Sequence, residues 1–205
     1  MMRIGVLGGT FDPVHYGHLM LAESCRQQLN LDCVRFIPAG QPPHKMNHRI
    51  TDGHARADML SYAVAGYPEF QIDRREIRRS GPSWTVETLA ELKAEMPEAE
   101  LFFLMGADSV QSILTWREPL RIVQLATIVA CNRPGFTAVT REQIDQTLDA
   151  AIARRITLVS IPGTDLSATD LRQRVRSGLG LRFMTPRAVE TYIAENRLYL
   201  DDASS

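Results

Sequence analysis

The hydrophobic and polar positions along the chain predict strands that alternate with helices. Mostly apolar runs, typical of strands that a parallel sheet buries on both faces, occur at residues 3–7, 34–38, 101–105, 128–131 and 156–161, and a less regular strand-like stretch occupies residues 70–77. Segments with apolar residues at helical spacing, or with a helix-capping start, occupy residues 17–29, 54–65, 83–96, 108 onward and 141–154. This alternation indicates an α/β fold with a doubly wound parallel sheet, whose ligands bind outside the carboxyl ends of the strands.

The chain shows no internal repeat, low-complexity tract or interdomain linker, so we expect a single domain over residues 1–205. Helices predicted at residues 167–177 and 186–197 form its C-terminal helical part, about residues 165–200. Residues 38–54 are rich in Pro, Gly, His and Asn and lack periodicity, which predicts a long surface loop. Function often lies in such loops.

Composition and charge narrow the class of protein. The 205 residues are 44% hydrophobic, enough for a sizeable core, and the formal net charge is −1 with a pI near 6.5. Without a global basic field, the chain is not expected to bind nucleic acid or an anionic membrane, and any phosphate binding must be local. No segment has the roughly 18 consecutive apolar residues of a membrane span, and the first strand-like run begins too early for a signal peptide.

The cysteines bear on the compartment. Cys25, Cys33 and Cys131 are odd in number and widely spaced, which suits reduced thiols better than a disulfide framework or a metal site. We therefore expect a cytoplasmic protein. The sequence leaves its oligomeric state open, a homo-oligomer included.

The segment from Gly8 to His18 reads GGTFDPVHYGH and lies between the first predicted strand and the first predicted helix. Its glycines let a phosphate approach the backbone, and the start of the helix supplies unpaired N–H groups and the positive end of a dipole. His15 and His18, three positions apart, can face the same ligand. Neutral imidazoles donate hydrogen bonds to phosphoryl oxygens, and protonated ones add charge. The segment thus predicts a phosphate site.

Other interpretations of this segment are weaker. The glycines alone could make a turn, and the histidines could cap or line the helix, but their joint occurrence with Thr10 directly after a strand favours the functional interpretation. A zinc site would need a Cys or carboxylate at suitable spacing, and none accompanies the histidines. The segment also lacks the Lys-Ser/Thr ending of a P-loop and the Gly-x-Gly-x-x-Gly of a dinucleotide-binding fold.

Instead, the segment resembles the GGTFDPxHxGH signature of the nucleotidyltransferase superfamily, which is built on a Rossmann-like sheet. Further motifs extend the resemblance over nearly the whole chain and narrow it to the bacterial nicotinate-nucleotide adenylyltransferases. They are similar to that family's PPHK loop (residues 42–45), its SYTxxTL segment (83–89, with Trp84 in place of Tyr), its GxDS turn and downstream Trp (106–109 and Trp116), its RPG turn (133–135) and its ISSTxIR segment (166–172, with Ala168 in place of Ser).

The resemblance implies an adenylyltransferase of NAD biosynthesis. The phosphate of nicotinate mononucleotide would attack the α-phosphorus of ATP, giving nicotinate adenine dinucleotide and pyrophosphate without a covalent enzyme intermediate. Mg²⁺ is expected on the ATP phosphates, with no protein ligand identified. The alternatives are another adenylyl- or cytidylyltransferase of the superfamily, acting on phosphopantetheine or nicotinamide mononucleotide, and a nucleotide-binding regulator that has lost catalysis.

The resemblance also assigns roles to individual residues. Those expected in catalysis are His15, His18, Lys45 and Arg172. Those expected to bind ATP are Gly8, Gly9, Thr10, His15, His18, Gly106, Asp108, Ser167, Thr169 and Arg172. Those expected to bind the acceptor are His44, Lys45, Ser83, Trp84, Thr85, Trp116 and Arg117, with Trp116 stacking on the pyridine ring.

Several of these residues have a purely structural interpretation as well. Ser167 with Asp170 forms a capping-box pattern, and Ser83 and Asp108 stand where helix caps are common. A lone Trp116 would more often be a core aromatic, and His44 with Lys45 could be a solvated loop tip. A cap leaves other first-turn N–H groups free, so capping and phosphate binding can coexist at one helix start.

Overall fold

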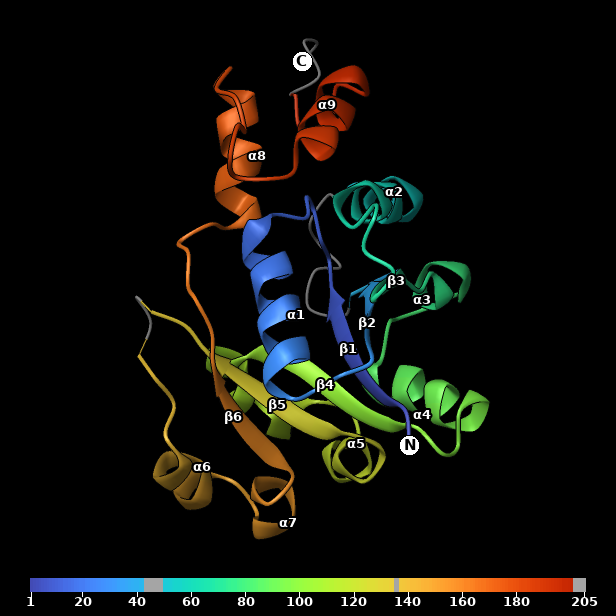
Figure 1. The fold of residues 1–205 in the computed structure, drawn as a ribbon, viewed down its shortest axis with the longest axis vertical. Coiled ribbons are helices and arrows are strands. Elements are labelled where there is room, and N and C mark those ends of the chain that lie inside the picture. Colours follow the sequence, from blue (N-terminus) through green and yellow to red (C-terminus); the bar gives the residue numbers. More distant parts are fainter. Residues whose placement is uncertain (43–49, 135–136, 201–205) are drawn as a thin grey trace.

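The computed structural model describes residues 1–42, 50–134 and 137–200, which fold around one parallel sheet (Figure 1). Its six strands are β1 (Arg3–Gly9), β2 (Cys33–Pro38), β3 (Phe70–Ile72), β4 (Glu100–Gly106), β5 (Thr127–Asn132) and β6 (Ile156–Ser160). They pair in the order β3-β2-β1-β4-β5-β6, and every pairing is parallel. The chain therefore winds from β1 to one edge and then from β4 to the other, with the switch point between β1 and β4. The predicted doubly wound sheet is confirmed.

Helices cover both faces of the sheet. They are α1 (Tyr16–Gln28), α2 (Gly53–Ala63), α3 (Arg75–Arg78), α4 (Thr85–Glu95), the 3₁₀-helix η2 (Ala107–Thr115), α5 (Pro119–Leu125), α6 (Arg141–Thr147), α7 (Ala150–Ala153), α8 (Ala168–Arg176) and α9 (Arg187–Glu195). One hydrophobic core lies beneath α1, α2, α8 and α9, and the other beneath α4, η2, α5, α6 and α7. Successive residues of β4 such as Phe102 and Phe103 enter opposite cores, which explains why the strands are continuous apolar runs.

The C-terminal helices lie at the end of the molecule where β1 finishes. Figure 1 shows α8 and α9 at the top, far from the N-terminus, and α9 packs against α2. Leu171 of α8 and Val189 and Ile193 of α9 are buried in the same core as α1. The C-terminal part thus covers the end of the sheet at which ligands of this fold bind.

The structure corrects four details of the predicted elements. Gly8 and Gly9 belong to β1, where they pair with Ile37 and Pro38, rather than to a turn. The strand predicted over 70–77 is shorter than expected, because β3 ends at Ile72. The Asp73 carboxylate then accepts the N–H of Arg75, and the chain enters α3.

The third and fourth corrections concern helices. The helix predicted over 141–154 divides at Leu148, because Asp149 caps a second helix by accepting the N–H of Ala151 at 2.7 Å. The helix expected from Asp108 is the 3₁₀-helix η2, and α5 was not predicted at all.

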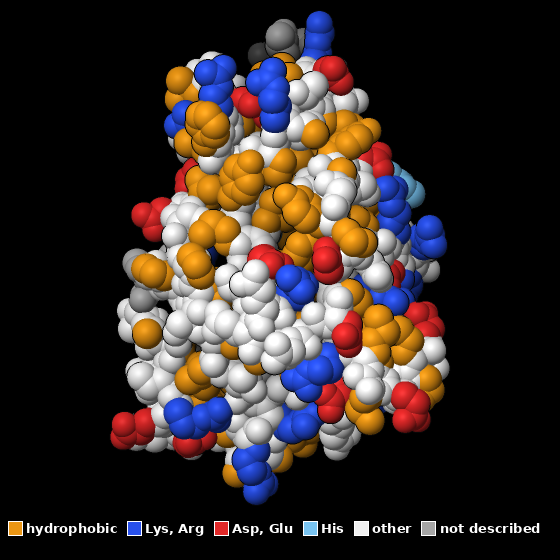
Figure 2. All heavy atoms as spheres, viewed as in Figure 1, with side chains coloured by type: hydrophobic (Ala, Val, Ile, Leu, Met, Phe, Trp, Pro, Cys, Tyr) orange, Lys and Arg blue, Asp and Glu red, His pale blue; other side chains and the backbone are white. Residues whose placement is uncertain are grey.

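The described surface mixes charges of both signs. On the face that Figure 2 shows, Lys and Arg are interspersed with Asp and Glu, and apolar side chains gather toward the C-terminal helices. Among the described residues, no helix is long and apolar enough to cross a membrane.

Candidate active site

The loop after β1 turns back sharply over the strand. Phe11 has a left-handed φ of 51° and the bond between Asp12 and Pro13 is cis. The Phe11 ring is buried and packs edge-on against His18 and Phe36. A Cβ on Gly9 would lie 3.0 Å from that ring. The glycine is therefore required so that Phe11 can fold back and fix the start of α1.

His15 and His18 cap α1 reciprocally. Nδ1 of His15 accepts the N–H of Gly17 at 3.1 Å, and Nδ1 of His18 accepts the N–H of His15 at 3.3 Å. The two rings stack with their centroids 3.8 Å apart. Capping and ligand binding were alternative interpretations of these residues, and the structure places the capping bonds on one nitrogen of each ring.

The capping bonds decide where each neutral imidazole carries its proton. A ring whose Nδ1 accepts a hydrogen bond bears its proton on Nε2, which then acts as a donor. Burial, with the nearby charge of Arg133 acting in the same direction, lowers the pKa of His15 to about 4. His15 is thus a neutral Nε2–H donor at physiological pH.

A cleft of about 310 Å³, here called the histidine cleft, opens beside these rings. It is lined by His15, Gly17, His18, Leu21, Gly106, Asp108, Ser109, Cys131, Arg133, the segment 161–164, Leu166, Ser167 and Ala168. The residues come from the carboxyl ends of β4, β5 and β6 and from the starts of α1, η2 and α8. Three helix starts facing one cavity form a positively polarised site suited to an anion.

Charged and polar groups frame this cleft. The Arg133 guanidinium lies 4.0 Å from the Asp108 carboxylate, with both side chains partly exposed. Ser167 caps α8: its hydroxyl accepts the N–H of Asp170 at 3.1 Å and donates to the Asp170 carboxylate at 2.7 Å. The cap uses the N–H of Asp170, and Ala168, the first residue of α8, lines the cleft.

Arg172 lies one turn into α8, at the back of the loop after β1. Its Nη1 donates to the Asp12 carbonyl at 2.7 Å, and its Nη2 lies 3.3 Å from the Thr169 hydroxyl. It lines a neighbouring hollow together with Asp12 and Tyr199 rather than the histidine cleft itself. Thr169 is exposed on the same helix turn.

On the other side of the β1 end lies a second hollow, here called the tryptophan pocket, with two adjoining parts of about 160 and 130 Å³. Both parts share Ser83, Thr85 and Trp116. The deeper part also reaches the segment Gly8–Thr10 and Phe103, against which Trp116 packs edge-on at a centroid distance of 5.8 Å. An apolar aromatic wall beside a helix start suits a flat ring that carries an anionic group.

Helix α4 begins at this pocket without a side-chain cap. Trp84 occupies its N-cap position and makes no capping bond, so the first N–H groups of α4 are not taken by a side chain. The Arg117 guanidinium lies 5.4 Å from the Trp84 ring centroid and 3.0 Å from the Glu87 carboxylate. Glu87 therefore offsets the charge of Arg117 at the pocket edge.

Ser83 supports the pocket from behind instead of capping α4. Its hydroxyl oxygen accepts the N–H groups of Gly40 at 3.0 Å and Gln41 at 3.3 Å. The buried Glu76 carboxyl accepts hydrogen bonds from Thr88 and Ser83. Burial raises the pKa of Glu76, while these bonds lower it. The network joins α3, α4 and the segment after β2.

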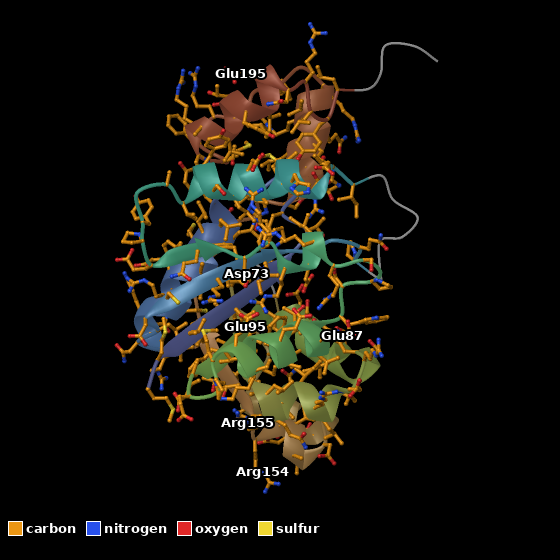
Figure 3. All side chains as sticks on the ribbon, turned by 90° about the vertical axis from the view of Figure 1, so that its right-hand side faces the viewer. Asp73, Glu87, Glu95, Arg154, Arg155 and Glu195 are labelled. Carbon is orange, nitrogen blue, oxygen red and sulfur yellow. The ribbon has the colours of Figure 1, made fainter. Side chains whose placement is uncertain are left out.

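Ion pairs hold α3 and α4 together on the outside. Arg75 pairs with Asp73 at 2.7 Å and with Glu95 at 2.9 Å. Figure 3 views this side of the molecule and labels Asp73 above α4 and Glu87 and Glu95 along that helix. The helix whose start faces the tryptophan pocket is thus fixed at both ends.

A model of the cytidylyltransferase-like family matches residues 6–174 of the chain. The chain belongs to this family.

Relatives within the family make the match more specific. A protein of Thermomicrobium roseum named probable nicotinate-nucleotide adenylyltransferase is 45% identical over 97% of this chain and 92% of its own length. Proteins of the same name from Moorella thermoacetica and Thermus thermophilus are each 41% identical, over 96% and 97% of this chain and 91% and 100% of their own lengths. The resemblance to the nicotinate-nucleotide adenylyltransferases is confirmed.

Solved structures share the fold. Nicotinic acid mononucleotide adenylyltransferase of Plasmodium falciparum, complexed with NaAD, superposes with a TM-score of 0.76 at 18% identity, covering 97% of this chain and 98% of that one. A putative nicotinate-nucleotide adenylyltransferase of Vibrio parahaemolyticus superposes with a TM-score of 0.66, also at 18% identity, covering 98% of both chains. These structures support the predicted Rossmann-like α/β architecture.

Most of the site residues predicted from the family motifs fall into two groups in the structure, whereas Arg172 lines the neighbouring hollow and Thr169 lines none of these cavities. His15, His18, Gly106, Asp108 and Ser167 line the histidine cleft. Ser83, Trp84, Thr85, Trp116 and Arg117 line the tryptophan pocket, and Gly8, Gly9 and Thr10, which we had expected on the ATP side, also line it. His44 and Lys45 lie outside the described residues.

Sequence reasoning missed three residues of this family member that hold the site. Arg133 was noted only as part of a turn, although it faces His15 and Asp108. Arg56 is buried and donates to the carbonyls of Thr51, Thr10 and Ala39, each at 2.7 Å. Tyr199 reaches back to the loop after β1. Of the three, only Arg56 had a local signal: it lies within the helix predicted over 54–65, among residues at apolar spacing, and an arginine that is buried there needs hydrogen-bond partners.

Among the described residues, no group of three or more His, Cys, Asp or Glu side chains is placed to hold a metal ion. Asp108 is the one carboxylate in the histidine cleft as described. A Mg²⁺ ion that arrives on a nucleotide is held chiefly by the phosphates and by water, so a cleft without a carboxylate cluster fits MgATP.

Proposed function

We propose that the chain is a nicotinate-nucleotide adenylyltransferase, which joins ATP and nicotinate mononucleotide to give nicotinate adenine dinucleotide and pyrophosphate. The observation that carries this proposal is the pair of cavities on either side of the β1 end. The histidine cleft suits a triphosphate, and the tryptophan pocket suits an aromatic ring with an anionic substituent. They adjoin the sheet's switch point, where ligands of doubly wound folds bind.

The donor side works by positioning and charge stabilisation. ATP lies in the histidine cleft with its adenosine toward Gly106 and Asp108 and its phosphates toward the starts of α1 and α8. The acceptor's phosphate oxygen attacks the α-phosphorus, and the bond to the bridging oxygen of pyrophosphate breaks. His15 and His18 donate through Nε2 to phosphoryl oxygens whose negative charge grows in the transition state. Arg172 and Lys45 neutralise the departing pyrophosphate.

The neutral state of His15 suits this role. With a pKa of about 4 in the ligand-free chain, His15 is neutral at neutral pH and offers its Nε2–H as a hydrogen-bond donor. The capping bond on Nδ1 holds the ring so that no reorientation is needed at the moment of reaction.

The acceptor side selects the nucleotide by its ring. The pyridine ring stacks on Trp116, and its carboxylate accepts N–H groups from the start of α4 near Thr85. Because Glu87 offsets Arg117, the helix start rather than that arginine supplies the attraction. The Gly8–Thr10 segment, which lines the pocket next to the histidine cleft, lies where the two phosphates meet.

Mg²⁺ enters as part of the MgATP substrate, held chiefly by the phosphates. Its charge offsets that of the triphosphate. The free thiols of Cys25, Cys33 and Cys131 support a reducing, cytoplasmic setting for the reaction.

A panel of acceptors tests the proposal. Pyrophosphate release from MgATP is measured with nicotinate mononucleotide, nicotinamide mononucleotide, 4′-phosphopantetheine or no acceptor. We expect release only with an acceptor, and fastest with nicotinate mononucleotide. If 4′-phosphopantetheine were turned over faster, it would be the acceptor instead of nicotinate mononucleotide. If no acceptor led to pyrophosphate release, the chain would be a nucleotide-binding protein without transferase activity.

A further inference from the structure

The C-terminal segment holds the backbone on both sides of His15. Every second residue from position 12 to position 16 forms a hydrogen bond with the C-terminal segment: Asp12, Val14 and Tyr16. The Thr185 hydroxyl donates to the Val14 carbonyl at 2.8 Å, and the N–H of Tyr16 donates to the Met184 carbonyl at 3.1 Å. Together with the bonds at Asp12, these contacts place His15 in a backbone segment that the C-terminal helices clamp.

Asp12 is the most heavily bonded of the three. It is only 4% exposed, and its carbonyl accepts from Arg172. Its Oδ1 accepts the Tyr199 hydroxyl at 2.7 Å, and its Oδ2 accepts the N–H of Thr51 at 3.2 Å. A buried carboxylate needs such donors, because losing one leaves charge that water cannot solvate.

Tyr199 reaches Asp12 from beyond α9. It has a left-handed φ of 66°, and its ring packs against the core shared by α1 and α9. Burial raises the pKa of Tyr199, with the neighbouring Asp12 acting in the same direction, so the phenol keeps its proton and remains a donor. A left-handed backbone at a residue with a large side chain costs free energy, which the ring packing and the hydroxyl bond offset.

We propose that Tyr199 is a positioning residue for nucleotidyl transfer: by donating to Asp12, its hydroxyl fixes the loop that carries His15 and the carbonyl that orients Arg172. The inference rests on the proposed function, and it extends the site to the end of the described chain. Tyr199 touches neither substrate. It acts on the placement of two groups that meet the triphosphate from different helices, α1 and α8.

This arrangement predicts which kinetic constants depend on the hydroxyl. His15 lines the histidine cleft and Arg172 lines the hollow beside it, whereas the tryptophan pocket is held by Ser83, Glu76 and α4. Removing the hydroxyl should therefore lower kcat and weaken ATP binding. The KM for nicotinate mononucleotide should not change. A general loss of stability would not divide the constants in this way.

The test compares Tyr199→Phe with the matched control Tyr192→Phe. Tyr192 lies on α9 and packs against the same core, but it stacks on Tyr62 rather than contacting Asp12. We expect Tyr199→Phe to lower kcat by about tenfold or more, since misplacement by about 1 Å can cost on the order of 100-fold. The KM for nicotinate mononucleotide should stay within about twofold for both variants, a change of only ~0.4 kcal/mol.

A double-mutant cycle shows whether the hydroxyl acts through Asp12. In an Asp12→Ala background, Tyr199→Phe should cause little further loss, because the bond is already absent. Asp12→Ala alone should show the same division of constants, so this single variant still tests the proposal if Tyr199→Phe folds poorly. Equal and additive losses from the two substitutions would overturn the proposal.

Ring NMR of His15 separates this inference from the proposed function. Tyr199→Phe should shift the ¹⁵N resonances of the His15 imidazole, and Tyr192→Phe should not. This readout needs no substrate, so it decides the placement even if the wild-type protein fails to turn over nicotinate mononucleotide. An unchanged His15 spectrum together with wild-type kcat would show that the hydroxyl has no positioning role.

Discussion

The imidazole of His18 accepts the backbone N–H of His15, three residues before it, at 3.3 Å. Since the His15 ring in turn accepts the N–H of Gly17, both rings begin α1 and both line the histidine cleft. Each ring therefore uses its Nδ1 for the helix, and the proposed function assigns the Nε2 of each ring to phosphate. A substitution at either position removes both a helix cap and a proposed phosphate-binding group, and experiments must separate the two effects.

Replacement of His18 by Ala should abolish most turnover. We expect kcat to fall by about 100- to 1000-fold, the usual effect of removing one donor to developing charge. The loss of the cap should cost only about 1 kcal/mol of stability. Steady-state rates and thermal unfolding of the same preparation measure the two effects.

His54→Ala is the matched control for that prediction. His54 also stands in the first turn of a helix, α2, but it is exposed and lies outside both cavities. It should leave kcat within about twofold of wild type, ~0.4 kcal/mol. If His18→Ala retained kcat within about threefold, its assigned role would be wrong.

The pKa of His15 makes stability depend on pH. Its folded value of about 4 lies below the ordinary 6.5, so between these values the unfolded chain binds a proton that the folded chain does not. The free energy of unfolding should therefore fall as the pH is lowered from 6.5 to 4, by about 3 kcal/mol relative to a variant without the group. Above pH 6.5 the contribution should be constant.

Denaturant unfolding of wild type and His15→Asn at several pH values measures this difference. Asn can still accept the N–H of Gly17 as an N-cap, and it does not titrate. NMR titration provides a direct check, because the His15 ring should stay neutral down to about pH 5. An ordinary titration near pH 6.5 would contradict the burial argument.

Arg172→Ala should weaken the binding of ATP more than the binding of the acceptor. A charge-assisted hydrogen bond to phosphate contributes about 1.5–3 kcal/mol, so we expect ATP affinity to fall about tenfold or more. Calorimetric titration with each substrate measures the effect. Arg174→Ala removes the same charge from α8, but that side chain bonds to the Gly180 carbonyl, and ATP affinity should change little. Weakened acceptor binding with unchanged ATP affinity would reassign Arg172.

Nicotinate mononucleotide should be preferred over nicotinamide mononucleotide. The two differ in a carboxylate or an amide on the ring, and the uncapped start of α4 favours the anion. An amide can still turn its oxygen toward those N–H groups, so the preference rests on charge-assisted bonding and is not absolute. The ratio of kcat/KM values at fixed MgATP measures it. If both acceptors were used equally, the nicotinate-specific assignment would be wrong, and only the broader assignment as a pyridine-nucleotide adenylyltransferase would remain.

Arg56→Met should destabilise the protein strongly. It removes the donors to three carbonyls that hold the ends of β1 and β2 beside α2, and each buried acceptor left unpaired costs about 1–3 kcal/mol. We expect a loss of at least about 3 kcal/mol in denaturant unfolding. Arg78→Met, at an exposed position of α3, should change stability by less than about 0.5 kcal/mol. Similar losses from both would show that the three bonds carry little free energy.

The fold was largely predictable because its strands are buried on both faces. A run such as Leu101–Met105 is apolar throughout, and that pattern needs no tertiary information. Helix α5 escaped prediction because it is short and follows Glu118, whose left-handed φ of 53° has no sequence signal. The length of β3 depended on one carboxylate, that of Asp73, which could equally have pointed to solvent.

The site was predictable where its residues are neighbours in sequence. His15 and His18 belong to one motif, and the resemblance located them, but not the exchange of capping bonds. The bond between Tyr199 and Asp12 joins residues 187 positions apart, and local patterns do not report such contacts. Ser83 lines the tryptophan pocket, and no local pattern indicates that its hydroxyl accepts the N–H groups of Gly40 and Gln41 in the segment after β2.

The two cavities are built from segments of the chain that scarcely overlap. The histidine cleft is lined from residues 15–21, 106–109, 131–133 and 161–168, whereas the tryptophan pocket is lined from residues 6–10, 37–42, 76–89, 103 and 115–122. Substitutions that reshape the pocket can therefore accumulate during divergence while the nucleotide donor stays the same. On such a scaffold, a new acceptor can evolve by changes in a few short stretches of sequence, and an engineer can alter those stretches without redesigning the cleft that receives ATP.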